Sequence, residues 1–244
     1  MRDWSGKRYW LVGASEGLGR ALAQKLSAAG CHLVLSARSE DRLKDLADSL
    51  PGQCTVAPCD ISDDASVAEA AGMAGELDGV VFLASVYWPQ SAREWNAEQV
   101  TAMCDINFTG CARVLGQVVP KMVAREAGHI VITGSLTAFR GLPGSIGYTP
   151  SKAALLSLAE CMHYDLRKTG VDVQILNPGF IKTRQTDKND FAMPMIMEPE
   201  KAAEIMFDFM QTDGFKKSFP APFSWVFRGS QFLPDWLYYR MFGS

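Results

Sequence analysis

Long apolar runs, a strong charge bias and metal-binding spacings are all missing from this sequence. No stretch approaches the roughly 20 apolar residues that a membrane-spanning helix requires, so no transmembrane segment is expected. Arg2, Lys7 and Arg8 are not followed by the apolar run of a signal peptide. The formal net charge is only -3, which lacks the electrostatic footprint of a nucleic-acid-binding protein. We therefore expect no nucleic-acid partner.

Histidine is scarce, and cysteine does not occur in close pairs. His32, His129 and His163 have no metal-ligand spacing, which favours structural roles and predicts no metal site. The six cysteines form no Cys-x-x-Cys pair and lie mostly in apolar segments. Reduced thiols in a cytoplasmic protein fit this pattern better than a disulfide framework. With 48% hydrophobic and 21% charged residues, the chain can bury a sizeable core.

Short apolar runs alternate with helical patterns over most of the chain. The expected strands cover residues 9–12, 32–37, 55–58, 79–84, 128–133 and 171–176. The expected helices cover residues 17–29, 40–50, a segment opened by 62–64, 96–125 with a break near Asp105, and 149–168. This alternation is typical of parallel βαβ units. It predicts an α/β fold over residues 1–244, a single-domain, doubly wound (Rossmann-like) parallel sheet with a C-terminal helical extension.

A glycine-rich turn follows the first expected strand. Gly13, Gly17 and Gly19 have the spacing Gly-x-x-x-Gly-x-Gly and lead into the first expected helix. Glycines allow the backbone to approach a pyrophosphate, and a helix N-terminus supplies N–H groups and a positive dipole end. The position between a strand and a helix favours a dinucleotide site over a simple tight turn.

A tyrosine and a lysine lie one helical turn apart in the segment 148–152. Tyr148 and Lys152 are four residues apart, and Ser135 lies thirteen positions upstream. A nearby ammonium favours the phenolate and can lower the pKa of a tyrosine from about 10, which suits proton exchange with a substrate. Pro150 is tolerated near the start of a helix. The spacing also occurs on ordinary surface helices, so the other segments must decide.

Taken together, these segments resemble the short-chain dehydrogenase/reductase family. The resemblance rests on the glycine turn, Ser135, and Tyr148 with Lys152, and it covers residues 7 to about 183. Further matches in the same order are Asp60-Ile61, Asn107 and the segment 177–183. The resemblance implies a nicotinamide dinucleotide cofactor and hydride transfer between a carbonyl and an alcohol.

The resemblance also implies roles for four catalytic residues. Tyr148 is expected to act as general acid in reduction and general base in oxidation. Lys152 is expected to lower the pKa of Tyr148 and to hold the nicotinamide ribose. Ser135 is expected to hydrogen-bond the substrate oxygen and orient it. Asn107 is expected to help hold a water that links Lys152 to solvent.

The cofactor contacts expected by the same analogy follow the chain from the glycine turn to the end of the sixth strand. They are Gly13, Ser15, Glu16, Gly17, Leu18, Gly19, Arg38, Asp60, Ile61, Ala84, Tyr148, Lys152, Pro178, Gly179, Ile181 and Thr183.

Residues at the end of the second expected strand favour NADP(H) over NAD(H). A carboxylate there would bind the ribose hydroxyls and repel a 2′-phosphate, but the chain has Ala37 followed by Arg38. Arginine can bind a phosphate through charge-assisted hydrogen bonds. The alternative is that Arg38 is a solvated loop cation. Glu16 argues against NADP(H), because relatives that prefer NADP(H) often have a basic residue at that position, although Ser15 can still donate its hydroxyl to the phosphate.

Two positions depart from the family pattern. Relatives usually have threonine in place of Val12 and Asn-Ala-Gly in place of Leu83-Ala84-Ser85, and those polar groups interact across adjacent strands. Because both sites are apolar here, we interpret Val12 and Leu83 as a paired replacement, which can be nearly neutral. Ser85 adds a side chain near the nicotinamide.

The last 60 residues have no motif of assignable chemistry. In the family, residues 184–198 form a flap over the substrate. The apolar, methionine-rich part of this segment suits a hydrophobic carbonyl or alcohol, or else packs in the core. Tyr87, Trp88, Phe139 and Leu142 are further pocket candidates. The aromatic segment 219–244 fits a packed helix pair, a partner interface or a peripheral membrane anchor.

The function predicted from these observations is that of an NADP(H)-dependent oxidoreductase with an apolar carbonyl or alcohol substrate. The alternative from another class is a binding protein that senses the dinucleotide without turnover, although a sensor would not require Ser135, Asn107, Tyr148 and Lys152. Family members with these residues also run epimerase or dehydratase chemistry. The long helices that follow Asn96 and Thr149 commonly form the subunit interface in relatives, so we expect a homodimer or homotetramer.

Overall fold

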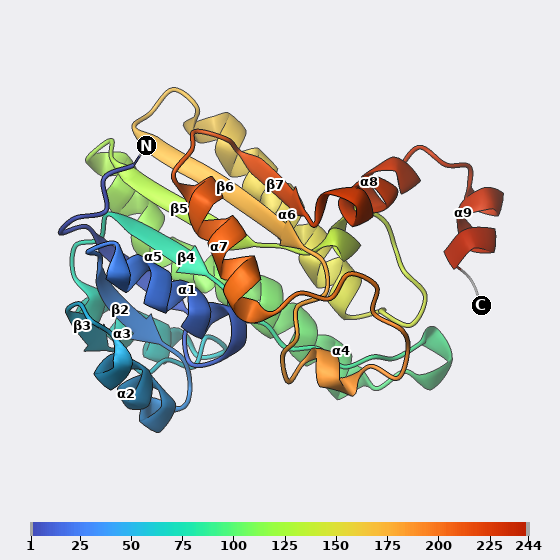
Figure 1. Cartoon of the computed structure of the whole chain (residues 1–244), viewed down its shortest axis with the longest axis horizontal. Coiled ribbons are helices and arrows are strands. Elements are labelled where there is room, and N and C mark those ends of the chain that lie inside the picture. The colour runs from blue at the N-terminus through green and yellow to red at the C-terminus, as the bar shows by residue number, and fades with distance from the viewer. Residues whose placement is uncertain (1, 243–244) are drawn as a thin grey trace.

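The computed structural model describes residues 2–242 as alternating strands and helices around one sheet (Figure 1). Within those residues the strands are β1 (Arg8–Val12), β2 (His32–Ser36), β3 (Cys54–Val56), β4 (Gly79–Phe82), β5 (Gly128–Thr133), β6 (Val171–Pro178) and β7 (Lys216–Phe219). The α-helices are α1 (Gly17–Ala28), α2 (Glu40–Ser49), α3 (Asp64–Ala74), α4 (Ala97–Cys104), α5 (Gly110–Ala124), α6 (Tyr148–Leu166), α7 (Pro199–Met210), α8 (Ala221–Ser230) and α9 (Asp235–Phe242). Shorter helical turns are η1 (Ala92–Glu94), η2 (Asp105–Thr109, a π-helix), η3 (Leu136–Phe139) and η4 (Thr186–Lys188).

All strand pairs in the sheet are parallel, in the order β3-β2-β1-β4-β5-β6-β7. The chain first moves outward from β1 to β3 and then crosses back to β4 on the other side of β1. The sheet therefore has a switch point between β1 and β4, and ligands of doubly wound sheets bind at the carboxyl ends of the strands there. The doubly wound α/β architecture expected from the sequence is confirmed.

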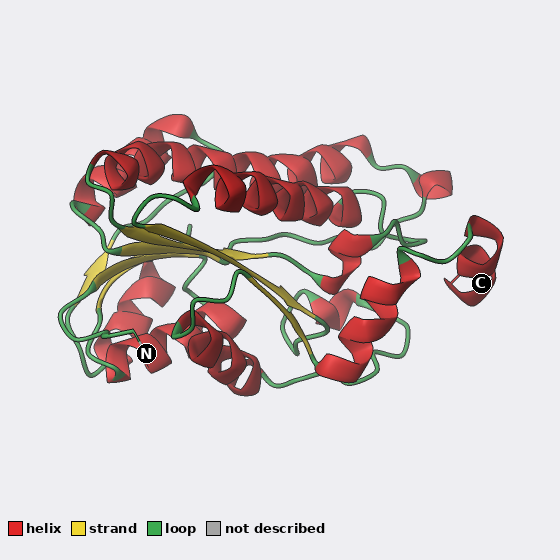
Figure 2. Ribbon diagram, turned by 90° about the horizontal axis from the view of Figure 1, so that it is seen from above, coloured by secondary structure: helices red, strands yellow, loops and turns green. Residues whose placement is uncertain are grey.

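Helices cover both faces of the sheet, which Figure 2 shows edge-on between two helix layers. Successive strand residues point to opposite faces. Trp10 and Val12 of β1 belong to one core cluster with residues of α3, α5 and α6, whereas Tyr9 and Leu11 belong to a second cluster with residues of α1, α2 and α7. Both faces are buried, which explains why the strand sequences are almost continuously apolar.

Most elements lie within one or two residues of their expected positions. The expected break in the long helix near Asp105 is present: α4 passes into η2 and then α5. The strand expected to reach residue 84 ends at Phe82, because the amides of Leu83 and Ala84 both donate to the Val12 carbonyl. The strand expected to end at residue 176 continues to Pro178, where it pairs with β7.

β7 was not expected from the sequence. Its four residues read Lys-Lys-Ser-Phe, and its two lysines are exposed at the edge of the sheet. Only Phe219 is buried, at 2% exposure, so the segment has neither the length nor the apolar pattern of the other strands. Its pairing with β6 forms it, which is a tertiary effect that local sequence does not encode.

The aromatic C-terminal segment forms the two helices α8 and α9, as one of the three interpretations expected. The flap segment 184–198 has little regular structure, and Phe191, Met195 and Ile196 are 49%, 48% and 41% exposed. These three residues therefore do not pack in the core, whereas Met197 at the end of the apolar part of the segment packs against the core cluster that includes residues of α1 and α7. All six cysteines are free, and no described helix is both long and apolar enough to cross a membrane.

Candidate active site

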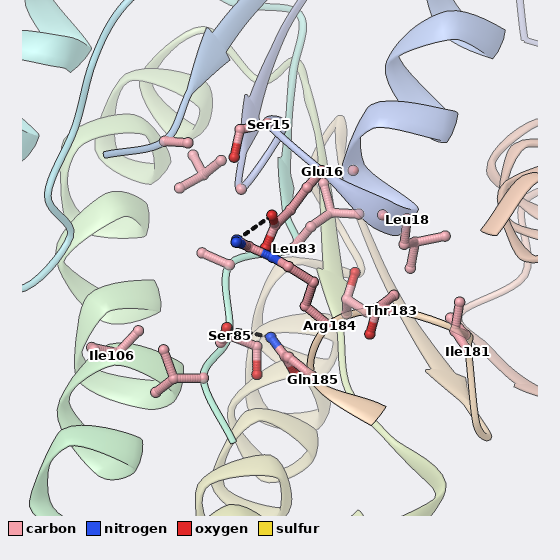
Figure 3. Close-up of a pocket in the computed structure, with 18 of the residues that line it drawn as sticks. Ser15, Glu16, Leu18, Leu83, Ser85, Ile106, Ile181, Thr183, Arg184 and Gln185 are labelled. Carbon is pink, nitrogen blue, oxygen red and sulfur yellow. Dashed lines mark hydrogen bonds and ion pairs between the residues drawn. The ribbon is translucent and has the colours of Figure 1, made fainter. Parts of the chain in front are cut away.

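A cavity of about 590 Å³ opens at the carboxyl ends of the strands, around the switch point (Figure 3). The residues expected to bind the cofactor all line it: Gly13, Ser15, Glu16, Gly17, Leu18, Gly19, Arg38, Asp60, Ile61, Ala84, Tyr148, Lys152, Pro178, Gly179, Ile181 and Thr183. Ser135 lines it as well. Segments that are more than 100 residues apart in the chain therefore meet around one space.

The glycine turn lies tightly against neighbouring backbone. Gly13 has φ +97, and a Cβ there would lie 2.5 Å from the Ala84 nitrogen. A Cβ on Gly19 would lie 2.0 Å from the Gly13 carbonyl oxygen. Side chains at these positions would displace the turn from the start of α1, where backbone N–H groups are available to an anion. The turn thus has the shape that a dinucleotide pyrophosphate requires.

The Glu16 carboxylate, at the first residue before α1, is paired with two arginines. Arg42 Nη1 lies 3.0 Å from Glu16 Oε2, and Arg184 forms a second ion pair with the same oxygen, drawn in Figure 3. The two cations offset the negative charge that argued against NADP(H) binding. Arg42 and Arg184 both line the cavity, and sequence reasoning missed them because α2 and the flap meet Glu16 only in the folded chain.

Arg38 is exposed and lines the cavity, as does Asp60. Asp60 has an internal role: its carboxylate accepts hydrogen bonds from the Ser62 hydroxyl at 2.6 Å and the Ser62 amide at 3.0 Å. These hydrogen bonds hold the pKa of Asp60 below its usual range, with a smaller contribution from the Arg38 charge. The Asp60 carboxylate thus remains ionised beside Arg38.

The beginning of the flap is fastened across the cavity to the segment after β4. The Gln185 amide donates to the Ser85 carbonyl, and Lys188 Nζ donates to the Tyr87 carbonyl at 2.8 Å. Gln185 and Thr186 also line the cavity, although no sequence motif points to either of them. Together with the Arg184–Glu16 pair, these contacts connect the flap to both sides of the switch point.

Three of the four catalytic candidates come from two elements, η3 and α6. Ser135 caps η3 directly after β5, and its Oγ accepts hydrogen bonds from the Thr137 amide and hydroxyl at 3.2 and 3.1 Å. Tyr148 is the first residue of α6, and Lys152 follows one turn later. The helical turn directs both side chains to the cavity that Ser135 also lines.

The Lys152 ammonium is buried and lies behind the Tyr148 ring. Its Nζ is 5.6 Å from the ring centroid and donates to the Thr133 carbonyl at 3.1 Å. The Tyr148 ring also meets the Tyr87 ring edge-to-face, with 5.0 Å between the ring centroids. Tyr87 therefore lies beside Tyr148, although neither it nor Trp88, Phe139 or Leu142 lines the cavity described above.

The pKa values of the two groups shift in ways that correct the sequence expectation. Burial raises the pKa of Tyr148 to about 12, although the neighbouring Ser135 and Ser85 hydroxyls act in the opposite direction. Burial lowers the pKa of Lys152 to about 8. The expectation that Lys152 lowers the pKa of Tyr148 is not met in this structure, because removal of the phenol from water is the largest effect and raises its pKa. The phenol is protonated here and ready to donate.

Asn107 does not line the cavity. It lies in η2, fully buried, and its Oδ1 accepts from the Val86 amide at 2.7 Å while its Nδ2 donates to the Val86 carbonyl and the Ser151 hydroxyl, each at 3.0 Å. The Ser151 hydroxyl donates to the Tyr148 carbonyl at 2.7 Å. Asn107 thus joins the segment after β4 to the first turn of α6, and it is a positioning residue in this structure.

Two buried hydroxyl groups that line the cavity have no hydrogen-bond partner within residues 2–242. They belong to Ser85 and Thr133. Buried polar groups are nearly always hydrogen-bonded, so these two are suited to a bound molecule.

Val12 and Leu83, the apolar pair, line the same space, where the Leu83 amide donates to the Val12 carbonyl at 2.8 Å. The strands remain joined by backbone contacts.

Comparisons with known proteins find relatives over most of the chain. A family model described as short chain dehydrogenase matches residues 7–192. An uncharacterized oxidoreductase of Myxococcus xanthus is 36% identical over 98% of this chain and 97% of its own length. The 3-oxoacyl-acyl-carrier-protein reductase FabG of Rickettsia felis is 30% identical over 77% of this chain and 78% of its own.

Two solved structures have the same fold. A short chain dehydrogenase/reductase from Burkholderia phymatum in complex with NAD superposes with a TM-score of 0.86 at 24% identity, over 93% of this chain and 94% of that one. Actinorhodin polyketide ketoreductase with NADPH has a TM-score of 0.79 at 20% identity, over 92% and 99%. At these identities the likeness concerns the fold.

Proposed function

This chain belongs to the short-chain dehydrogenase family, and from that premise we propose that it is an NADP(H)-dependent oxidoreductase that interconverts a carbonyl and an alcohol by hydride transfer. The observation that carries the proposal is that Ser135, Tyr148 and Lys152 line the same cavity as the glycine turn. A purely dinucleotide-sensing protein would not need the first three. The family binds nicotinamide dinucleotides. We propose that this member prefers NADP(H) and uses it to reduce a carbonyl or oxidise an alcohol.

The cavity fits a dinucleotide on two observations. The turn at Gly13 and Gly19 excludes even a methyl group, and the hydroxyls of Ser85 and Thr133 lack partners among the described residues. The turn and the N-terminus of α1 would hold the pyrophosphate, and Lys152 the nicotinamide ribose. When bound, the nicotinamide supplies or accepts the hydride.

The residues of this chain would then manage the proton and the substrate oxygen. Tyr148 donates its phenolic proton to the developing alkoxide in reduction, which suits a group that is protonated at neutral pH. The Ser135 hydroxyl, already oriented by Thr137, hydrogen-bonds the substrate oxygen and holds it near the phenol. Asn107 maintains this geometry from behind α6 through Ser151.

Turnover distinguishes this proposal from the sensing alternative. Nicotinamide absorbance is followed over a panel of carbonyls and alcohols with NADPH and with NADH. The panel includes apolar carbonyls and alcohols, because the flap exposes apolar side chains such as Phe191 and Met195. It also includes 3-oxoacyl thioesters, because one relative is a 3-oxoacyl-acyl-carrier-protein reductase. Turnover of any member supports an enzyme, and saturable NADPH binding without turnover of any of them supports a sensor.

The preference for NADP(H) is proposed to rest on Arg38, with Arg42 beside it. We expect Arg38→Ala to raise the KM for NADPH about tenfold or more and to change the KM for NADH little, because a charge-assisted contact to the 2′-phosphate is lost. Steady-state kinetics with both cofactors measures this. Arg93→Ala, which removes an exposed arginine outside the cavity, is the matched control. Equal effects of Arg38→Ala on both cofactors would refute the phosphate role.

We propose that the protein is a homodimer or homotetramer that assembles through α5 and the outer side of α6. Val123 and Tyr164 on these helices are 38% and 64% exposed and offer apolar surface to a second copy. Light scattering should give two or four times the 26.7 kDa mass of one chain. A mass near that of one chain would contradict the proposal.

We place the protein in the cytoplasm on the basis of its thiols. Cys31, Cys59 and Cys111 are buried and free, and burial raises the pKa of each of them. Free thiols persist in a reducing compartment.

A further inference from the structure

The helices α8 and α9 and the turn that joins them, residues 231–234, expose several large apolar side chains, most of them aromatic. Phe232, Trp236 and Trp225 are 88%, 69% and 67% exposed, and Tyr239 and Met241 are also largely in solvent. We call these five residues the C-terminal aromatic surface. Single exposed apolar residues are ordinary, but a group of this size on one helix pair marks an interaction site.

The aromatic surface is held outward by a well-anchored helix pair. Arg140 Nη1 donates to the carbonyls of Ser230 and Leu233 at 2.5 and 2.7 Å, between the two helices. Its guanidinium lies 4.0 Å from the ring centroid of Tyr238, whose hydroxyl donates to the Gly141 carbonyl at 2.6 Å. The exposed aromatic side chains therefore lie on a segment that is anchored to the rest of the fold.

Both views place α9 at one end of the molecule, and Figure 2 shows it beyond the two helix layers (Figures 1 and 2). Phe227 and Phe242 join the two helices, with ring centroids 6.1 Å apart. Each helix therefore buries one aromatic side and turns the other away from the protein, as amphipathic helices do at an interface.

The charged residues of the segment 219–242 that have no ion-pair partner among the described residues are positive. Arg228 and Arg240 are exposed, whereas the single carboxylate of residues 219–242, Asp235, is already ion-paired with Arg140. The segment 219–242 therefore has two exposed arginines and no carboxylate without an ion-pair partner, within a chain of net charge -3. A two-fold contact between copies through this surface would bring together the same arginines without a free carboxylate to pair them, which disfavours a second copy as its occupant.

We propose that the C-terminal aromatic surface docks on an anionic membrane surface. Tryptophan and tyrosine are enriched at the membrane–water interface, where an apolar ring and a polar edge are both satisfied, and arginines bind anionic headgroups. α8 and α9 have 10 and 8 residues, too short to span a bilayer, so they would lie in its surface.

Docking there would bring lipid close to the flap. Phe180 lies between Phe223 of α8 and Phe191 of the flap, with ring centroids 5.8 and 6.0 Å apart. An apolar carbonyl or alcohol could then pass from the bilayer to the segment that covers the cavity. This consequence rests on the proposed function, whereas the docking itself does not.

Vesicle sedimentation of the full-length protein tests the docking. We expect binding to vesicles of phosphatidylcholine mixed with phosphatidylglycerol, and weaker binding to phosphatidylcholine alone. The double variant Trp225→Ala/Trp236→Ala should lower the affinity for vesicles at least about tenfold, because two rings that docking would bury in the bilayer surface are lost. Arg228→Gln and Arg240→Gln should each lower the affinity for anionic vesicles about fivefold.

Trp95→Ala is the matched control, because Trp95 is 59% exposed after η1 and lies outside α8 and α9. Unchanged thermal melting of each variant establishes that it is folded. Wild-type protein that stays in solution with both vesicles, or a double variant that binds as tightly as wild type, would overturn the proposal. The proposal would also be overturned if neither protein bound lipid and the double variant had a lower light-scattering mass than wild type. That result would identify the surface as an interface between copies of this chain. Binding is measured without cofactor or substrate, so absent turnover does not affect the result.

Discussion

Replacing Tyr148 by phenylalanine should lower kcat by a factor of about 10²–10⁴ while leaving dinucleotide binding unchanged. The substitution removes only the hydroxyl that lies beside Ser135, and it keeps the ring that packs against Tyr87 at 5.0 Å. The proton acceptor and donor of the reaction is lost, but the glycine turn and Lys152 remain. Steady-state turnover together with a fluorescence titration of NADPH separates the two effects.

Tyr164→Phe provides the control for this experiment. Tyr164 lies in the same helix, is 64% exposed and is far from the cavity lining, so its hydroxyl should not affect turnover. A Tyr148→Phe enzyme that retains turnover close to wild type would rule out the proton-transfer role. Loss of NADPH binding in this variant would instead point to a structural role for the hydroxyl.

Replacing Lys152 by methionine should abolish most turnover and yet stabilise the fold at neutral pH. The buried ammonium has its pKa lowered from 10.5 to about 8, which means that the folded state disfavours the charged form. Below pH 8 both states carry the proton, and the folded protein bears the full cost of burying it. Allowing for the lost hydrogen bond to Thr133, we expect the variant to be ~1–2 kcal/mol more stable at pH 7.

The pH dependence of this difference gives a sharper check. Between about pH 8 and 10.5 the unfolded chain still binds the proton that folded Lys152 has released, so wild-type stability rises with pH relative to the variant. Urea denaturation across this range should show the difference shrinking. Lys168→Met, at an exposed lysine after α6, should change neither stability nor turnover. A variant that is less stable than wild type at pH 7 would show that Lys152 is primarily structural.

The same two residues illustrate how far sequence reasoning reaches. The spacing of Tyr148 and Lys152 predicts that they share one side of a helix, because helical geometry is local, and the structure agrees. The direction of the phenol pKa was predicted wrongly, because desolvation depends on everything packed around the group. Burial cannot be read from two residues and their separation.

Charged residues around the cofactor cavity show a second boundary. Arg38 was identified because it follows a predicted strand, which is local information. Arg42 and Arg184 were not, because one lies on α2 and the other on the flap, and only folding brings both to Glu16. The sequence alone suggested that Glu16 disfavours NADP(H), whereas its two ion pairs in the fold offset its negative charge.

The sequence by itself determined the order of β1 to β6 with the helices between them, the glycine turn and the expected cofactor residues, all of which line the cavity, because apolar periodicity and motif spacing act over a few residues. Only the tertiary structure decided the edge strand β7, the buried position of Asn107, the Glu16 ion pairs and the outward direction of the aromatic rings on α8 and α9. Each of these depends on which distant segment lies alongside, and therefore on the net balance of burial, charge and hydrogen bonding across the whole fold.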